Sequence, residues 1–594
     1  MNNRVCIIRD TTSNYPGKES YFRPSENYPE YDYNDMAESG TNKVYDMVRQ
    51  GLKMYGLDLG NYGTSNWNPL GSYIKEDDVV LIKPNLVLDK NRSGLGEECL
   101  YTHPSVAAAV IDYVCRALKG TGRIIVGDAP LQDCDFDRLV NDSGYRDLVR
   151  YYKDMGISIE LRDFRNVKTR EESGYYHLQE QEGNDGVVVR LDSDSMFAGL
   201  SEEHNDRLRI TNYDPQILRK HHTSGVHEYK ISQYLLEADV VINLPKPKTH
   251  RKAGITGALK NLVGINANKE YLPHHTLGSQ SEGGDAYHYE NKYYSMANQV
   301  LDIRNALMKA EKEEEAREAF LLYQSLKKLG STRDNENYWE GSWYGNDTIW
   351  RTVVDLNKIM FYADKKGIMR NEKQRKYFTV ADMIISGEKE GPLEPSPKEV
   401  GVLILGEDPL LIDQTISSLM GFDYRKIPQL SNPDAYLGKH QISTTDKPDI
   451  LSTEMGWDGG DLKSICDNYS LGFQPTLGWE DALGNKYKRE FIKKIKGVGS
   501  DIIIWGVGIN GKYAYEQLIK DNVKIKFFCD NCPPDENQVI IDDIICISPT
   551  DIQKNQYIII AVSDRYVEEI REQIRNMGCK AFGVINRNRW EYES

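Results

Sequence analysis

Histidines and lysines gather in one short stretch of the chain. The run Pro245-Lys246-Pro247-Lys248-Thr249-His250 is followed by a glycine-rich turn and then by Lys260. His274 and His275 continue the same connection. Histidine suits proton transfer near neutral pH and is the commonest metal ligand, while lysine binds anions as a point charge. This stretch therefore predicts an acid–base site for a small anionic substrate, and the alternative is a loop of solvated lysines.

Three residues are the catalytic candidates of this site. We predict that His103 and His250 are its two acid–base groups and that Lys260 acts with His250. His103 precedes Pro104 at the start of an expected helix, so a purely structural role as a helix cap is the alternative. Successive residues of a strand point to opposite faces, so only one of His274 and His275 is expected to bind a metal.

The elements that must hold these residues alternate between strands and helices. Apolar runs at 79–82, 123–126 and 157–161 are separated by helical patterns at 104–118 and 136–155. Such alternation is typical of a parallel sheet with crossover helices, and it predicts an α/β fold. Because ligands bind at the carboxyl ends of parallel strands, the residues that follow each run are candidates for binding.

The substrate- and anion-binding candidates follow strand ends or lie on apolar runs. They are Lys83, Asn85, Thr102, Asp128, Lys246, Lys248, Thr249, Asn261, Asp382 and Glu388. A carboxylate on an apolar run is unfavourable unless it has a partner, so Asp382 and Glu388 either belong to the site or cap loops. Asp413 is expected to form an ion pair or to cap a helix.

The length of 594 residues predicts two or three domains. We expect an α/β region at 1–430, with insertions at about 163–223 and 297–350, then a connector at 431–496 and a small domain at 497–594. Residues 297–329 are highly charged, and this pattern predicts one or two surface helices.

The last domain carries a glycine motif in a suitable context. The strand 501–505 leads into Gly506, Gly508 and Gly511, a helix follows, and the next strand ends near Asp530. This spacing is typical of a Rossmann-like mononucleotide-binding half, so these four residues are predicted to bind a nucleotide or a nucleotide-sugar.

The composition of the chain limits the classes of binding partner that we expect. A net charge of −16 argues against nucleic-acid binding, which needs clustered positive charge. No apolar stretch is long enough for a membrane helix, and the nine scattered cysteines do not resemble a disulfide framework. The sequence therefore predicts a cytoplasmic protein with a small anionic substrate and no membrane partner. The oligomeric state stays open, with a homo-oligomer as one alternative.

The motifs resemble those of a bacterial and archaeal family known as domain of unknown function 362. The resemblance spans about residues 79–422 and rests on these segments: Ile82-Lys83-Pro84-Asn85, Thr102-His103-Pro104, Gly127-Asp128-Ala129-Pro130, 245–250, 256–262, 382–392 and 408–421. The family name implies no activity.

A second, more distant resemblance is to the nickel-pincer lactate racemases. Their order of a His, a glycine-rich turn, a cofactor-holding Lys and a metal-binding His is similar to His250, Gly257, Lys260 and then His274 or His275. This resemblance implies a racemase-like α/β fold and a metal ion, nickel or iron, at the histidines. The C-terminal domain in turn resembles the nucleotide-binding domains of bacterial sugar-modifying acyltransferases.

These observations lead to a first hypothesis and two alternatives. The first is an epimerase- or racemase-like enzyme that moves a proton on an anionic hydroxy-acid or sugar-type substrate. One alternative is a non-catalytic binding protein for a phosphorylated or nucleotide-linked sugar. The other is a redox protein whose metal centre comes from a partner.

Overall fold

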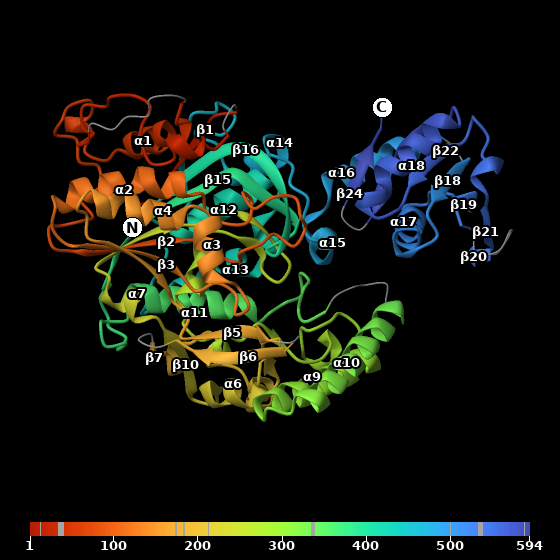
Figure 1. Cartoon of the computed structure of the whole chain (residues 1–594), viewed down its shortest axis with the longest axis horizontal. Helices are drawn as coiled ribbons and strands as arrows, with labels where there is room; N and C mark the ends of the chain where they lie inside the picture. The colour runs from red at the N-terminus through yellow and green to blue at the C-terminus, as the bar shows by residue number, and fades with distance from the viewer. Residues whose placement is uncertain are drawn as a thin grey trace. The chain divides into compact units, whose positions relative to one another are not determined.

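The computed structural model describes residues 1–11, 14–33, 41–172, 175–181, 185–211, 213–333, 339–498, 501–532, 539–586 and 589–593. Two compact units make up the chain, Met1–Leu483 and Gly484–Ser594 (Figure 1). Strands and helices are mixed in both units, which confirms the predicted α/β class.

The first unit is built on one large sheet. Its strands run in the order β17-β1-β16-β15-β11-β2-β3-β4, and β12 and β13 pair beside β15. Their bounds are β1 (Arg4–Arg9), β2 (Val79–Pro84), β3 (Arg123–Asp128), β4 (Ile159–Asp163), β11 (Val240–Leu244), β12 (Lys248–His250), β13 (Gly254–Thr256), β15 (Lys376–Glu390), β16 (Glu394–Gly406) and β17 (Asp449–Ser452). The strands from β15 through β11, β2 and β3 to β4 are parallel, as the sequence pattern predicts.

Helices cover both faces of this sheet because both faces are apolar. Val80 and Ile82 of β2 pack with α1 (Lys43–Tyr55), α2 (Pro104–Leu118) and α4 (Tyr145–Asp154). Leu81 lies on the other face, with α8 (Ala258–Asn261), α11 (Ile349–Tyr362) and α12 (Pro409–Met420). Figure 1 shows α1 and α2 on one side of the sheet and α11 on the other. Because both faces of this strand are buried, its sequence is a continuous run of apolar residues.

The chain changes direction at the middle of the sheet. From β2 it proceeds outward to β3 and β4, and it then returns to β11 on the opposite side of β2. The carboxyl ends of β2 and β11 therefore form a topological switch point, the place where ligands bind in open α/β sheets. Lys83 lies near the end of β2, and the motif with Lys246 and Lys248 follows the end of β11.

Smaller elements complete the first unit. Residues 431–483, expected to be a connector, contribute β17, which pairs with β1. The charged 297–329 segment forms parts of two helices, α9 (Lys292–Lys309) and α10 (Glu313–Arg333). The other elements are α3 (Phe136–Asp142), β5 (Val167–Glu172), β6 (Tyr175–Glu180), β7 (Val187–Arg190), α5 (Glu202–Asp206), β8 (Leu208–Arg209), α6 (Pro215–His221), β9 (His222–Thr223), β10 (Val226–Ile231), α7 (Gln233–Glu237), β14 (His275–Thr276), α13 (Pro428–Ser431), α14 (Leu462–Asn468) and α15 (Glu480–Leu483).

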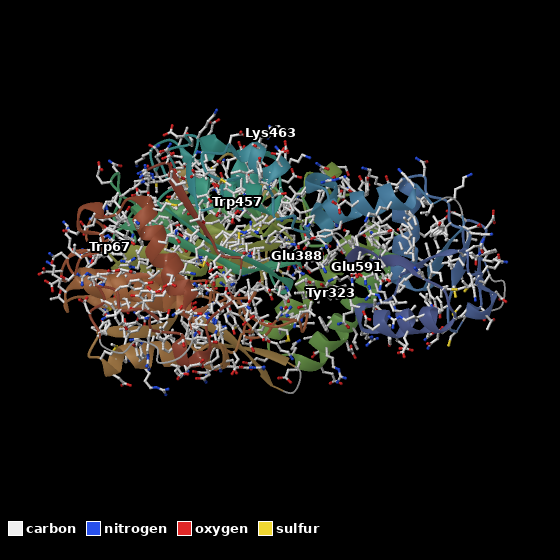
Figure 2. The ribbon with its side chains drawn as sticks, turned by 90° about the horizontal axis from the view of Figure 1, so that it is seen from above. Trp67, Tyr323, Glu388, Trp457, Lys463 and Glu591 are labelled. Carbon is white, nitrogen blue, oxygen red and sulfur yellow. The ribbon has the colours of Figure 1, made fainter. Side chains whose placement is uncertain are left out.

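Two buried tryptophans each bond to a nearby segment of the chain. Figure 2 shows Trp67 among the red and orange N-terminal elements and Trp457 among the teal ones. Each indole N–H donates a 2.9 Å hydrogen bond to a backbone carbonyl, Trp67 to Leu57 and Trp457 to Tyr469. Both large side chains are therefore buried without losing a hydrogen bond.

The second unit has its own sheet and its own apolar cores. The strand order is β20-β21-β19-β18-β22-β23-β24, with parallel pairing from β21 to β23. The bounds are α16 (Lys486–Ile495), β18 (Ile502–Trp505), α17 (Ile509–Lys520), β19 (Phe527–Cys529), β20 (Val539–Ile541), β21 (Ile544–Ile547), β22 (Tyr557–Ile560), α18 (Asp564–Asn576), β23 (Ala581–Asn586) and β24 (Arg589–Tyr592).

Two further expectations concern the whole chain. Among the helices of the described residues, none has the length and apolar character needed to cross a membrane. All nine cysteines are free thiols, in agreement with the absence of a disulfide framework.

Candidate functional site

A buried ion pair lies at the carboxyl ends of β2 and β3. The ammonium of Lys83 is 2.6 Å from the Asp128 carboxylate, and both side chains are almost fully buried. Asp128 also accepts hydrogen bonds from the backbone N–H groups of Leu86, at 2.6 Å, and Ala129, at 2.8 Å. Gly264 packs directly on this pair, where a Cβ would come within 1.8 Å of the Asp128 carboxylate. Both charged groups therefore have their partners inside the protein, and the pair joins the ends of the two strands.

An amide network lies beside the ion pair. Lys248 donates to the side-chain oxygen of Asn85 at 2.6 Å and to the carbonyl of Leu100 at 2.7 Å. Asn85 donates in turn to Asn261 at 2.9 Å, and its backbone N–H donates to the Thr102 hydroxyl at 2.9 Å. Burial, and then the charge of Lys246, lowers the pKa of Lys248 to about 7. The predicted residues Asn85, Thr102, Lys248 and Asn261 thus lie together.

A second group, here called the Tyr15 cluster, consists of Tyr15, His103, Lys246 and Asp382. The ammonium of Lys246 is 3.1 Å from the Asp382 carboxylate, and both side chains are inaccessible to solvent. Tyr15 donates to Asp382 at 2.7 Å, and its ring stacks on His103 with centroids 3.8 Å apart. Asp382 also accepts from the backbone N–H of His103 at 2.9 Å. A segment near the N-terminus therefore covers His103.

His103 also caps α2. Its Nδ1 accepts from the backbone N–H of Ser105 at 3.3 Å and lies 2.7 Å from the Ser105 hydroxyl. The edge of Tyr21 closes over the ring, with centroids 4.7 Å apart. Burial, followed by the charge of Lys246, holds the pKa of His103 well below its ordinary value. The imidazole is therefore neutral, with Nδ1 as the acceptor and the proton on Nε2.

A third group, the cationic cluster, consists of His250, Lys252, Lys260, Lys269 and His274. Its members lie close enough for their charges to interact. Burial and the charge of Lys260 hold the pKa of His250 well below its ordinary value, and burial, Lys252 and Lys260 do the same for His274. Like charges in a desolvated site disfavour one another. The nearby carboxylates act on the lysines, Glu340 on Lys252 and Asp128 on Lys260 and Lys269, and not on the two histidines. His103 and His250 thus belong to different clusters.

Lys260 differs from the other lysines of the site. In the described part of the chain its ammonium has no hydrogen-bond acceptor and no ion-pair partner, and its side chain is partly exposed. By contrast, Lys269 donates to the carbonyl of Ala129 at 3.0 Å and Lys252 donates to the carbonyl of Glu340. Burial and then the charge of Lys252 lower the pKa of Lys260 to about 8. A partly exposed ammonium without a partner in the protein is available to bind an external anion.

The two histidines of the cationic cluster have opposite hydrogen-bonding roles. Nδ1 of His250 accepts from the backbone N–H groups of Lys252 and Ala253, each at 3.1 Å. Nδ1 of His274 lies 2.7 Å from the carbonyl of Leu272, which can only accept. A neutral His250 therefore carries its proton on Nε2, whereas a neutral His274 has a lone pair on Nε2.

The cationic cluster does not fit a metal ion held by its own side chains. Of its two histidines only His274 presents a lone pair, and three lysines surround it with positive charge, which opposes a divalent cation. His275 is buried with its Nδ1 unpartnered among the described residues. Throughout the described residues, no group of three or more His, Cys, Asp or Glu side chains could hold a metal ion.

Three predicted residues have roles inside the protein. Thr249 donates to the carbonyl of Lys389 at 2.8 Å. Glu388, labelled in Figure 2, pairs with Lys398 at 3.2 Å and accepts from the backbone of Gln474 at 3.0 Å. Asp413 caps α8, one of the two roles expected for it, because it accepts from the backbone of Ala258 and Leu259 at 2.5 and 3.0 Å. These contacts shape the loops around the clusters.

Tyr15, Lys252 and Lys269 also belong to these clusters, although we did not predict them from the sequence. Lys252 lies two residues after His250, so the local charge was a usable signal. Lys269 and Tyr15 lie in stretches without a motif, and only the fold brings them to the site.

The glycine turn of the second unit connects β18 to α17. Asp530 accepts from the backbone N–H of Val507 at 3.2 Å and of Cys532 at 3.0 Å, so its carboxylate holds the turn in place. A Cβ at Gly511 would lie 1.8 Å from the carbonyl oxygen of Gly506, whereas a Cβ at Gly508 would meet nothing within 4 Å. Gly511 is thus required for close packing, and the space above Gly508 is open.

Fold and clusters together define an α/β protein with a buried, lysine-rich site at the carboxyl edge of a parallel sheet. Residues 80–183 and 195–418, more than half of the chain, match a family described as domain of unknown function (DUF362). The chain belongs to this family, which confirms the predicted assignment. Residues 498–585 match a family described as C2185-like, N-terminal.

One curated relative is the thylakoid-associated protein sll1697 of Synechocystis sp. (strain ATCC 27184 / PCC 6803 / Kazusa). It is 29% identical over 195 residues, which are 33% of this chain. The match spans 41% of that protein's length.

Proposed function

We propose that the first unit is an enzyme that binds a small carboxylate and moves a proton at a neighbouring carbon, as an epimerase or racemase does. The observation that carries this proposal is the unpartnered ammonium of Lys260 beside two neutral histidines. An anion bound there would offset the surplus positive charge of the cationic cluster. Hydroxy acids and sugar acids combine such an anion with an acidic C–H group.

Each cluster has a different role in the proposed reaction. Lys260 binds the carboxylate, with Lys252 and Lys269 adding to the positive potential. The Lys83–Asp128 pair and the amide network around Lys248 hold the strand ends on which the site rests. The Tyr15 cluster encloses His103, so the proton transfer is assigned to the cationic cluster alone.

Deuterium exchange tests this proposal. The protein is incubated in D2O with glycerate, malate and gluconate, and deuterium at the carbon next to the carboxylate is followed by mass spectrometry. Wild-type protein should exchange at least one of these acids, and Lys260→Met should lose most of this activity while keeping the fold. Binding without exchange would favour a non-catalytic binding protein, and exchange that persists unchanged in Lys260→Met would remove the site from consideration.

For the second unit we propose a nucleotide or nucleotide-sugar site at Gly506, Gly508 and Gly511. The open space above Gly508 and the position of α17 directly after the turn support it. Asp530 would act by holding the turn, since both of its oxygens accept backbone hydrogen bonds. Calorimetric titration with NAD and with UDP-glucose tests this site: Gly508→Asp should abolish binding, and no binding by the wild type would refute it.

A further inference from the structure

The two histidines of the cationic cluster are not equivalent, although both are neutral. Two backbone N–H groups point at Nδ1 of His250, at 3.1 Å each, and fix its proton on Nε2. The carbonyl of Leu272, 2.7 Å from Nδ1 of His274, fixes the proton of that ring on Nδ1. A backbone carbonyl cannot donate and a backbone N–H cannot accept, so neither ring can exchange its tautomer without losing these bonds.

We infer that His274 is the proton acceptor of the site and that His250 is a hydrogen-bond donor to the substrate's oxygen. This inference rests on the proposed function and sharpens it. It also reassigns both residues, because His250 was expected to act as a base and His274 as a metal ligand. The substrate must then present two groups together, an acidic C–H facing Nε2 of His274 and an oxygen facing Nε2–H of His250.

The proton transfer balances with these groups alone. The lone pair on Nε2 of His274 takes the proton, and the electron pair of the broken C–H bond stays on the substrate as an enolate. The enolate oxygen accepts the hydrogen bond from Nε2–H of His250. After the planar enolate has turned over, His274 returns the proton to the opposite face of the same carbon, which inverts it. A neutral imidazole that donates to a developing oxyanion stabilises it without itself changing charge.

The surrounding charges couple this step to substrate binding. Lys252, Lys260 and Lys269 oppose a positive charge on His274 while the site is empty, and burial acts in the same direction. A bound carboxylate offsets that positive potential and makes His274 a stronger base. Neutral analogues, such as the amide of the same acid, should therefore exchange much more slowly than the acid.

His103 does not provide a second lone pair. Its Nδ1 faces Ser105, and its ring is covered by Tyr15 and Tyr21. The structure thus assigns one base to the reaction, so inversion at the carbon requires the planar enolate to turn over in the site between the loss and the return of the proton.

Nuclear magnetic resonance of the full-length protein with 15N-labelled histidine tests the tautomers directly. The signals of the two rings are assigned by their loss in His250→Gln and His274→Gln. The expected result is a proton on Nε2 of His250 and on Nδ1 of His274. A proton on Nε2 of His274, or on Nδ1 of His250, would overturn the inference whether or not any substrate is turned over.

The rates of deuterium exchange in the same two variants then distinguish the proton acceptor from the hydrogen-bond donor. Glutamine keeps an N–H donor near the position of Nε2 but cannot take up a proton, so His250→Gln should lose about tenfold or less. His274→Gln should lose about 10²- to 10⁴-fold, the usual contribution of a general base. His221→Gln, outside the cluster, serves as the matched control and should exchange normally.

The outcomes for the two proposals differ. If the wild type exchanges gluconate and His274→Gln exchanges it equally fast, the inference fails and the proposed function stands. If the wild type exchanges none of the acids, the proposed function fails and the role of His274 as its proton acceptor fails with it, even where the resonance experiment finds the expected tautomers.

Discussion

Single lysines in this protein show how a partner, or its absence, decides what a buried cation can do. Lys248 has three oxygen acceptors around its ammonium and is a structural group. Lys260 has a similarly lowered pKa, about 8, and no such acceptor among the described residues. The sequence predicted Lys260 as a catalytic residue and Lys248 as an anion-binding residue. It could not show that Lys248 is used inside the protein, because Asn85 and Leu100 lie far away along the chain.

The lowered pKa of Lys260 predicts how anion binding depends on pH. Lys260 is charged below its folded pKa of about 8 and neutral above it, so affinity for gluconate should fall as pH rises from about 7 to 9. Lys252, at about 8, and Lys269, at about 7, change in the same direction. The two histidines stay neutral throughout because their pKa values lie well below ordinary.

Calorimetric titration of gluconate at several pH values measures this effect. Lys260→Gln should weaken binding by about tenfold or more at pH 7, since a hydrogen bond to a charged group contributes about 1.5–3 kcal/mol. It should also flatten the pH profile. Lys153→Gln, at an exposed position, should bind like the wild type. An affinity that rises toward pH 9 would contradict this account.

The Lys83–Asp128 pair should behave as a buried ion pair. Lys83→Met leaves the Asp128 carboxylate buried without its counter-charge, which costs about 3–5 kcal/mol of unfolding free energy. The double variant Lys83→Met/Asp128→Leu should recover part of that loss. Urea denaturation measures these differences, and Lys119→Met provides the exposed control, because its pair with Glu76 contributes at most about 1 kcal/mol. Equal losses for both lysines would show that Lys83 is not buried as described.

Individual elements depend on contacts that local sequence does not reveal. Apolar runs predicted β2, β3 and β11 because strands buried on both faces leave a continuous pattern. The short helix α8 has no such pattern, and it is stabilised from α12 by the Asp413 carboxylate. This cap could be predicted only as one of two roles for Asp413, since its partners lie more than 150 positions earlier.

Removal of this cap should destabilise α8. Asp413→Ala leaves the N–H groups of Ala258 and Leu259 without an acceptor in a buried site, which should cost about 1–3 kcal/mol of unfolding free energy. Because α8 carries Lys260, gluconate binding should weaken as well. The matched control is Asp446→Ala, at an exposed position, which should change stability by about 0.5 kcal/mol or less. A stable Asp413→Ala protein would contradict the proposed role of the cap.

At the scale of the whole molecule, all three clusters lie within the first unit. The sequence predicted a small C-terminal domain from its strand–glycine–helix pattern, and the compact second unit begins at Gly484. The segment 431–483 has weak periodicity, so its pairing through β17 with the N-terminal strand β1 could not be predicted locally. Long-range pairing of this kind depends on the completed sheet.

A truncated chain tests whether the first unit binds the acid and exchanges its proton without the second unit. The fragment 1–483 retains the whole sheet of the first unit and every residue of the cationic cluster. We expect it to fold, to bind gluconate like the full chain and to exchange deuterium at a similar rate. Circular dichroism and calorimetry check the fold and the binding, with the full-length protein as control. Loss of exchange in a folded, gluconate-binding fragment would show that the second unit takes part in the reaction.

The proposed function requires the cationic cluster to move a proton on a bound carboxylate. Its most direct test is the deuterium content of glycerate, malate and gluconate after incubation with wild-type protein in D2O. We expect uptake of deuterium next to the carboxylate of at least one acid, at a rate that falls about 10²-fold or more in His274→Gln. Acids that stabilise the protein against unfolding yet recover no deuterium would contradict it.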